Sequence, residues 1–338
     1  MRLFGKDLER EVAVVAEIGV NHEGDPAAAE ALVRAAAGAG ADAVKLQTYT
    51  PERFASASDP ARLARVARFR LDEATHRHLA AVAAANGISL FSTAVTEDVV
   101  PFLAELGPAV KIASGDVDFE VLVRAAAGAG KPVILSTGNA SLEEIDRAVQ
   151  WCTEEIGRDR VADRLAILHC VSAYPAPVEQ ANVRSVPFLK ARYGLTTGYS
   201  NHVLEPEAAL AAVALGAQIV EVHVTDRKTG REFRDHALSF EPAELAALVQ
   251  SIARVRASLG DDGKRIQPVE EPLRPLMRKG VVAARDLPAG TVLRDADLMY
   301  ARPATEFTAA ERPRLVGGRL LKDLKRGELI ARSAVALP

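Results

Sequence analysis

Two lysines lie within apolar segments of the sequence, where an unpaired charge is costly. Lys45 stands in AVKLQTY and Lys111 in AVKIASG. A lysine buried in a strand needs either a carboxylate partner or an anionic ligand. Hydroxyl side chains follow similar apolar runs at Thr93, Ser114, Ser136 and Ser200. Two ammonium groups among several hydroxyls offer the contacts that a ligand with both a phosphate and a carboxylate requires.

Two other interpretations of the lysines stay open. Glu17 and Asp116 could neutralise them in a purely structural network. One desolvated lysine could instead form a Schiff base with a carbonyl substrate. That chemistry favours a single lysine rather than two lysines beside several hydroxyls.

A second pair, His202 and His223, lies near the ends of two consecutive apolar segments. One histidine in a strand is usually a satisfied core residue. Two on neighbouring strands, with Glu17 in reach from the first strand, could hold a divalent metal that keeps positions open for water or substrate. This donor set suits Mn²⁺ better than Ca²⁺ and leaves Mg²⁺, Co²⁺ and Zn²⁺ possible. We expect His76 and His78, on a helix, to be solvated.

Secondary-structure elements must bring these side chains together. The sequence predicts eight strands that alternate with eight helices. The strand candidates are residues 12–19, 43–49, 89–95, 109–115, 133–138, 165–172, 195–201 and 219–225. Helical periodic segments lie between them, and one more follows the last strand. Nearly continuous apolar strands that alternate with helices indicate parallel pairing, buried on both faces. The pattern predicts a (β/α)8 TIM barrel over residues 1–260, with a doubly wound open sheet as the alternative.

One stretch, LVRAAAGAG, occurs twice, at residues 32–40 and 122–130. Its alanines favour a helix, and its last glycine suits the left-handed residue that ends one. Each copy leads into a predicted strand, as the alternation requires. In a parallel barrel the catalytic groups come from the C-terminal ends of the strands. The lysines, hydroxyls and histidines are therefore expected at one end of the barrel.

The composition points to a soluble protein that acts on small molecules. The chain has 338 residues and a formal net charge of −3, which gives no general attraction to nucleic acid. Its two cysteines, Cys152 and Cys170, are too few for a disulfide framework. The N-terminus lacks the apolar region of a signal peptide, and no run of 18 apolar residues occurs. We expect a cytoplasmic protein that neither spans a membrane nor binds nucleic acid.

The C-terminal part of the sequence has a different character. Residues 261–275 begin with the polar run DDGKRIQPVEE and are expected to form a linker. Residues 276–338 contain a weak internal echo, ARDLPAGTVL against LKDLKRGELI. Short strands with glycine turns are typical of a small β-rich domain.

Nine stretches of the sequence, in order, resemble signature motifs of the sialic acid synthase family. They are AEIGVNHEGD, DAVKLQTY, FSTAV, VKIASGD, PVILSTGNA, LHCVSAYPAP, GYSNH, EVHVTD and DHALSFEP. The C-terminal domain is similar to the antifreeze-like (SAF) domain of that family. The resemblance implies condensation of phosphoenolpyruvate with water and an open-chain N-acyl amino sugar such as N-acetylmannosamine. The products would be a nine-carbon 2-keto-3-deoxy acid and phosphate, released by C–O cleavage.

The resemblance also implies roles for individual residues. The family's phosphoenolpyruvate ligands fall on Lys45, Thr93, Lys111, Ser114, Ser136 and Ser200, and its metal ligands fall on His202 and His223. Its acidic and sugar-side positions fall on Glu17, Gln47, Asp116, Ser172, Tyr174 and Asp235. Arg302 matches an arginine that the SAF domain offers to the barrel of the other subunit, which implies a domain-swapped homodimer.

The sequence departs from the family on the sugar side. Val222 replaces a basic residue, Asn201 a common Asp and Ser172 a frequent Asn, and the segment between Gln47 and Thr93, which covers the sugar in the family, is shorter. The acceptor therefore stays open among N-acetylmannosamine, its 6-phosphate, a di-N-acetylated 6-deoxyhexose and another aldose. A Schiff-base lyase or aldolase and a non-catalytic saccharide-binding protein are the alternative functions.

Overall fold

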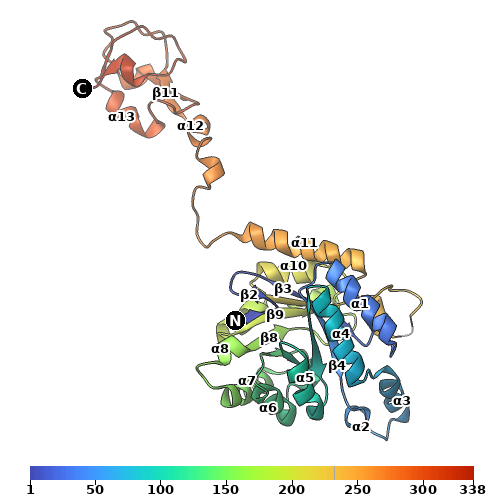
Figure 1. Ribbon diagram of the computed structural model, residues 1–338. Coiled ribbons are helices and arrows are strands. Elements are labelled where there is room, and N and C mark those ends of the chain that lie inside the picture. Colours follow the sequence, from blue (N-terminus) through green and yellow to red (C-terminus); the bar gives the residue numbers. More distant parts are fainter. Residues whose placement is uncertain (232) are drawn as a thin grey trace. The chain divides into compact units, whose positions relative to one another are not determined.

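Eight parallel strands close into a barrel within residues 1–260 (Figure 1). The computed structural model describes residues 1–231 and 233–338. The strands are β3 (Ala13–Gly19), β4 (Ala43–Thr48), β5 (Ser89–Ala94), β6 (Val110–Ile112), β7 (Val133–Ser136), β8 (Leu165–His169), β9 (Thr196–Asn201) and β10 (Ile219–His223). β10 pairs with β3 and sets His223 beside Glu17. The predicted (β/α)8 barrel is confirmed, and the open-sheet alternative is wrong.

Helices surround the strands (Figure 1). The longer ones are α1 (Pro26–Gly38), α3 (Pro60–Phe69), α4 (Glu73–Ala85), α5 (Val100–Leu106), α6 (Glu120–Gly128), α7 (Leu142–Ile156), α9 (Ser185–Tyr193), α10 (Glu207–Ala214) and α11 (Pro242–Leu259). The shorter helices are α2 (Pro51–Phe54) and α8 (Val161–Arg164). Strands buried on both faces follow from this arrangement, because the helices cover the outside and side chains fill the inside.

The repeated LVRAAAGAG stretch occupies equivalent places in the barrel. One copy ends α1 and the other ends α6. The closing glycines, Gly40 and Gly130, have φ angles of 85° and 79°, which other residues adopt with strain. Both copies then turn into a strand, as predicted. The repetition therefore encodes the same helix-to-strand turn twice.

Apolar side chains close the amino end of the barrel. Phe91, Ile134 and Ile219 are fully buried in one cluster inside it. An N-terminal hairpin, β1 (Arg2–Leu3) and β2 (Lys6–Asp7), adds Leu3 and Leu8 to the same cluster. The polar side chains of the strands consequently lie at the carboxyl end of the barrel.

Residues 261–338 form the second unit. It contains α12 (Arg274–Met277), α13 (Arg312–Leu315) and two antiparallel pairs, β11 (Gly280–Ala283) with β12 (Leu298–Ala301) and β13 (Arg319–Leu320) with β14 (Val335–Ala336). The predicted β-rich character is confirmed. The segment predicted as a linker, 261–275, holds a 3-10 turn at Pro268–Glu270 and the first residues of α12.

The internal echo of this unit has a structural cause. Leu287 and Leu324, equivalent residues of the two copies, donate backbone hydrogen bonds to each other's carbonyls at 2.8 Å. The carboxylates beside them act reciprocally: Asp286 accepts the backbone N–H of Arg326 at 3.0 Å, and Asp323 accepts that of Ala289 at 2.7 Å. The echoed segments thus pair with one another around a local twofold arrangement.

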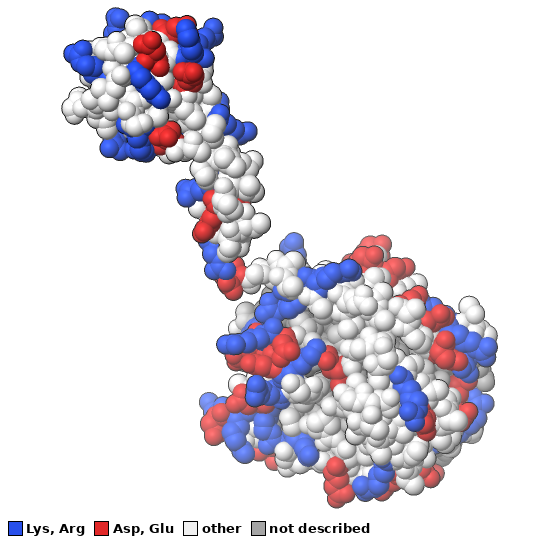
Figure 2. Space-filling model, turned by 45° about the horizontal axis from the view of Figure 1, so that its top comes forward, with Lys and Arg blue, Asp and Glu red and all other residues white. Residues whose placement is uncertain are grey.

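None of the described helices combines the length and apolarity that a membrane crossing requires. On the face shown in Figure 2, Lys and Arg side chains alternate with Asp and Glu on both units. That face therefore carries no extended patch of one sign.

Candidate active site

The inward side chains of the barrel form two layers. In six strands an apolar residue of the buried cluster is followed two positions later by a polar residue, which faces the same way because side chains alternate along a strand. The apolar members are Val15, Ala43, Phe91, Ala109, Ile134 and Ile219. The polar members, here called the polar layer, are Glu17, Lys45, Thr93, Lys111, Ser136 and Glu221. The polar layer is the floor of a cavity at the carboxyl end.

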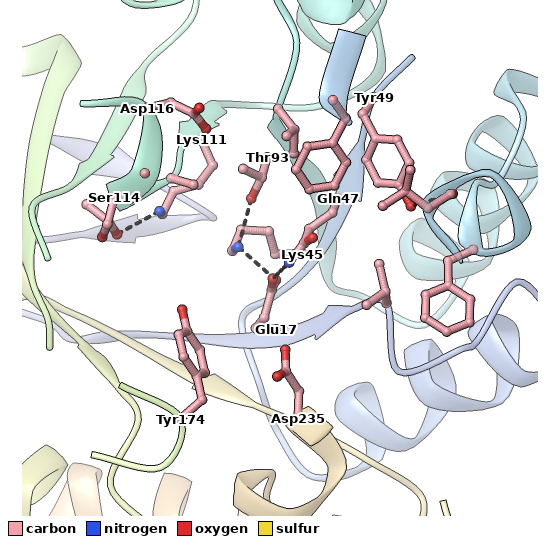
Figure 3. A pocket seen from close by; sticks show the side chains of 18 of the residues that line it. Glu17, Lys45, Gln47, Tyr49, Thr93, Lys111, Ser114, Asp116, Tyr174 and Asp235 are labelled. Atoms are coloured by element: carbon pink, nitrogen blue, oxygen red, sulfur yellow. Dashed lines mark hydrogen bonds and ion pairs between the residues drawn. The ribbon is translucent and has the colours of Figure 1, made fainter. Parts of the chain in front are cut away.

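This cavity has a volume of about 1190 Å³ (Figure 3). Thirteen of the predicted site residues line it, namely Glu17, Lys45, Gln47, Thr93, Lys111, Ser114, Asp116, Ser136, Tyr174, Ser200, His202, His223 and Asp235. Ser172 is exposed and is not among the described residues that line the cavity. Arg302 is exposed in the second unit.

Lys45 is held by two carboxylates. Its Nζ lies 2.8 Å from Glu17 Oε2 and 3.7 Å from Glu221 Oε1, and it donates to Thr93 Oγ1 at 2.9 Å. Burial acts to lower the pKa of this ammonium group, but the two carboxylates outweigh it and raise the pKa above its ordinary value. The cationic form of Lys45 is therefore favoured, which disfavours Schiff-base formation at this lysine.

Lys111 has a different environment. Its Nζ donates to Ser136 Oγ at 2.7 Å and to the Ile112 carbonyl at 3.0 Å, and no described carboxylate lies within ion-pair distance. Burial lowers the pKa of this lysine, more than the charge of Glu221 raises it. The proposed neutralisation of Lys111 by Asp116 is thus not found. An anion bound beside Lys111 would restore the charge balance of the cavity.

Glu221 belongs to this site, although the sequence analysis did not select it. It accepts a hydrogen bond from Ser200 Oγ at 2.9 Å, and its Oε2 is buried without a hydrogen-bond partner among the described residues. Burial opposes its ionisation, but Lys45 and Lys111 lower its pKa to about 2. The pKa of Glu17 is instead raised by burial, with Glu221 adding to the shift against the opposing charge of Lys45. The signal was available, because Glu221 and His223 alternate with valines in IVEVH.

A glycine, Gly138, contacts the hydroxyl group of Ser114. The backbone N–H of Gly138 donates to Ser114 Oγ at 3.0 Å, and Cys170 Sγ lies at the same distance from that oxygen. A Cβ at Gly138 would come within 2.7 Å of Cys170 Sγ and 2.5 Å of Ser172 Oγ. Ser114 Oγ would lie 3.0 Å from that Cβ, so a larger residue at position 138 would force one or more of these three side chains to shift.

The histidine pair comes from adjacent strands. The ring centroids of His202 and His223 are 5.4 Å apart, and the Tyr174 ring lies 4.2 Å from that of His202. Burial, together with His223, lowers the pKa of His202 to about 4, so its ring is neutral at pH 7. His202 Nδ1 bonds the Val171 carbonyl at 2.6 Å, which leaves Nε2 as the nitrogen available to a metal.

This pair fits a divalent ion with only two protein ligands. Among the described residues no group of three His, Cys, Asp or Glu side chains is set for metal binding. Asp235 Oδ2 lies 4.0 Å from His223 Nδ1, where a carboxylate can orient the ring. The remaining ligand positions would fall to water and substrate oxygens.

Further polar groups line the same cavity. Tyr174 and Asp235 point toward Glu17 in Figure 3, and Gln47 donates to Glu17 Oε1 at 3.3 Å. The guanidinium of Arg234 lies 4.8 Å from the Tyr174 ring centroid. Burial raises the pKa of Asp116, at the other side of the cavity, to about 6. These groups can orient a polyhydroxylated ligand.

Helix α3 contributes an outer wall that the sequence analysis missed. Arg62, Arg65, Val66 and Phe69, here called the α3 face, all line the cavity. Their spacing of three and four residues puts them on one side of the helix, which was the available signal. Phe69 packs edge-on against Phe233 of the segment after β10, with ring centroids 5.5 Å apart. The α3 face is thus joined to the segment that carries Asp235.

One expectation about histidines is wrong. His76 is buried rather than solvated, because its Nε2 bonds Thr48 Oγ1 at 2.8 Å and Thr48 bonds Ser92 Oγ at 2.7 Å. It braces α4 against β4 and β5, two strands of the polar layer. The neighbouring His78 is exposed, as expected, and contacts Glu30.

Comparison with known proteins identifies the family. Residues 32–264 match the NeuB family, and residues 278–336 match the SAF domain. The chain belongs to the NeuB family. The N,N'-diacetyllegionaminic acid synthase of Campylobacter jejuni is 33% identical over 336 residues, 95% of this chain and 99% of that protein. The N-acetylneuraminate-9-phosphate synthase of Mus musculus is 32% identical over 296 residues, 83% of this chain and 80% of that protein.

A solved structure agrees with this assignment. The N-acetylneuraminic acid synthetase of Leptospira borgpetersenii, crystallised with citrate, is 35% identical and has a TM-score of 0.72, over 78% of this chain and 90% of that one. The resemblance indicated by the nine motifs and by the C-terminal domain is confirmed. This NeuB-family protein is accordingly an enzyme, and a role as a non-catalytic binding protein is wrong.

Proposed function

We propose that this NeuB-family enzyme condenses phosphoenolpyruvate with an open-chain N-acyl amino sugar and water, giving a nine-carbon 2-keto-3-deoxy acid and phosphate. The observation that carries the proposal is the buried Lys111, without a carboxylate within ion-pair distance, in the same cavity as the pair His202 and His223. The first calls for an anionic substrate, and the second suits an ion that activates a carbonyl. The named synthase relatives support the same reaction class.

The polar layer would bind the donor. Lys111 and the hydroxyls of Ser114 and Ser136 would hold its phosphate, since they are clustered around a cation without a carboxylate. Lys45 and Thr93, on β4 and β5, lie on the side of Lys111 away from Ser136 along the strand order, and they would hold the donor carboxylate together with Ser200, which lines the cavity from β9. Fixing both ends of a three-carbon molecule removes much of the entropic cost of the bimolecular step.

His202 and His223 would hold a divalent cation, Mn²⁺ or in its place Mg²⁺ or Co²⁺, which when bound polarises the aldehyde oxygen of the acceptor. In the reaction, C3 of phosphoenolpyruvate bonds to the aldehyde carbon, water adds to C2, and the C–O bond to phosphate breaks. The water oxygen becomes the C2 carbonyl and gives up both of its protons, one to the aldehyde oxygen and one to the leaving phosphate. Glu17 is placed for this transfer, since it neighbours His223 and its pKa is raised by burial.

One observation favours a second candidate. The pKa of Lys111 is lowered by burial, which is how Schiff-base lysines are activated. A lyase or aldolase of this kind would form a covalent adduct with pyruvate, and borohydride would trap it on Lys111. The synthase forms no such adduct, so the mass of the protein after borohydride treatment separates the two.

A domain-swapped homodimer is part of the proposal. Its support is the match of residues 278–336 to the SAF domain and the exposure of Arg302, the residue expected to reach the other subunit's barrel. We expect the chain to be dimeric by light scattering. Mixing Arg302→Ala with Lys111→Met subunits would then restore activity to the active sites that receive an intact residue from each chain.

The decisive experiment is a panel of amino sugars incubated with phosphoenolpyruvate and Mn²⁺, scored by phosphate release and product mass. Donor labelled with ¹⁸O at the bridging position should transfer the label to phosphate, because C–O cleavage leaves that oxygen on phosphorus. Label retained in the keto acid, or phosphate release that no acceptor stimulates, would overturn the proposal.

A further inference from the structure

Four arginines line the cavity, and two of them are neutralised. Arg53, on α2, forms an ion pair with Glu97 and lies 3.9 Å from Asp98. Arg234 lies 3.2 Å from Asp235 through its Nε. The charges of these two arginines are therefore satisfied within the protein.

The other two, Arg62 and Arg65, are not neutralised. No described carboxylate lies within ion-pair distance of either guanidinium. Arg62 stacks 5.4 Å from the Phe54 ring centroid. Asp59, the acid nearest in sequence, is engaged in capping α3, where it accepts the backbone N–H of Arg62 at 3.0 Å. Two cations without a carboxylate partner among the described residues thus stand one helical turn apart.

The position of α3 directs these cations to the cavity. Arg62 and Arg65 share the α3 face with Val66 and Phe69, which are 7% and 4% exposed. A face that buries two of its four members cannot be a simple solvent-exposed face. Lone surface arginines need no ligand, but this pair lines the wall of a cavity whose floor is already charged.

The cavity is also larger than the donor requires. Its volume of about 1190 Å³ exceeds the range of typical small-molecule pockets, which reach about 1,000 Å³. The charges of a three-carbon donor are met by Lys45 and Lys111 in the polar layer. The α3 face lies outside that layer, where the second substrate must enter.

We infer that the acceptor sugar carries a phosphate monoester at the end remote from its aldehyde, and that Arg62 and Arg65 bind it. The inference rests on the proposed function. Two guanidinium groups at positions i and i+3 match a dianion, because each can give parallel hydrogen bonds to phosphate oxygens. A neutral acceptor would leave both cations of the α3 face without a partner.

The test compares N-acetylmannosamine with its 6-phosphate as acceptors for the full chain, with phosphoenolpyruvate and Mn²⁺ saturating. We expect kcat/KM to favour the 6-phosphate by at least about 10-fold. In the double variant Arg62→Gln, Arg65→Gln that preference should fall at least about 10-fold, with the KM for phosphoenolpyruvate unchanged. Arg65→Lys, which keeps the charge, should retain more of the preference than Arg65→Gln.

Arg147→Gln, an exposed arginine on α7 outside the cavity, is the matched control and should keep the full preference. Equal use of the two acceptors by the wild-type enzyme, or an undiminished preference in the double variant, would overturn the inference. In both cases phosphate release continues, so the proposed function stands.

If neither sugar turns over, the binding of each sugar is measured by calorimetry in the presence of phosphoenolpyruvate. The donor then occupies the polar layer, so that a sugar phosphate cannot bind there. Binding of the 6-phosphate that the double variant loses supports the inference, and equal or absent binding of the two sugars overturns it. Failure of the proposed function is distinct, since it shows as no phosphate release with any acceptor.

Discussion

The polar layer and the α3 face line one cavity, yet they hold their charges in opposite ways. Lys45, Lys111 and Glu221 are at most 5% exposed and are fixed by hydrogen bonds from neighbouring strands. Arg62 and Arg65 are exposed on a short helix between β4 and α4. We therefore expect the polar layer of the barrel to bind the donor, and α3 to select the acceptor. The first arrangement tolerates little change, whereas the second can vary without disturbing the barrel.

The comparison predicts first that metal removal stops the reaction whatever the acceptor. EDTA treatment should reduce phosphate release to background, and added Mn²⁺ should restore it, because the imidazoles of His202 and His223 are the groups suited to hold an ion. The α3 face has no part in this effect, so the double arginine variant should respond to EDTA in the same way. Unchanged turnover in the chelator would contradict the proposed histidine site.

Lys111→Met should give the next largest effect. Loss of the uncompensated cation should lower kcat/KM for phosphoenolpyruvate by about 10²–10⁴, the range typical of a single preorganised electrostatic group. The removal of a buried charge should not lower the melting temperature. Lys131→Met, outside the cavity, is the control. If only the KM for the acceptor rose, Lys111 would bind the acceptor rather than phosphoenolpyruvate, and the prediction would be contradicted.

Asp116→Asn tests how much the ionised carboxylate of Asp116 lowers the free energy of unfolding. The pKa of Asp116 is raised to about 6 by burial, so the folded state binds its proton more tightly than the unfolded state does. Stability is consequently lost as pH rises from the ordinary value of about 4 through 6. The variant should gain about 2 kcal/mol at pH 7.5 and nothing near pH 4.

Thermal unfolding at the two pH values measures this difference. Asp118→Asn, an exposed neighbour, should change stability by less than about 0.5 kcal/mol at either pH. A gain for Asp116→Asn that is equal at both pH values would show that the charge of this carboxylate is not the cause.

The smallest effect concerns the α3 face. Asp59→Ala removes the N-cap of α3 at a cost of about 1 kcal/mol, which should raise the acceptor KM a few-fold and leave the KM for phosphoenolpyruvate unchanged. Asp72→Ala removes the equivalent cap of α4, which does not line the cavity, and should affect neither KM. A rise in the donor KM for Asp59→Ala would mean that the two regions are not independent.

Sequence periodicity was enough to predict the barrel and to bring most of the candidate residues to one end of it. Alternating strand and helix periods fix which face of each strand is inward, and parallel strands all end at the same rim. Thirteen predicted residues therefore lie in one cavity. Strand ends, such as β6 stopping at Ile112 before a 3-10 turn, were less predictable because local turns compete with pairing.

The pairing of the buried charges could not be predicted from the sequence and depends on the folded arrangement. Glu221 joins Lys45, Lys111 keeps no carboxylate, and His76 is buried against Thr48, because each contact spans residues far apart in the chain. Likewise, the sequence alone does not show that the α3 face lines the cavity, because this depends on where α3 packs. Residue spacing predicts the direction of a side chain, whereas burial and pairing depend on which distant segments the fold brings to it.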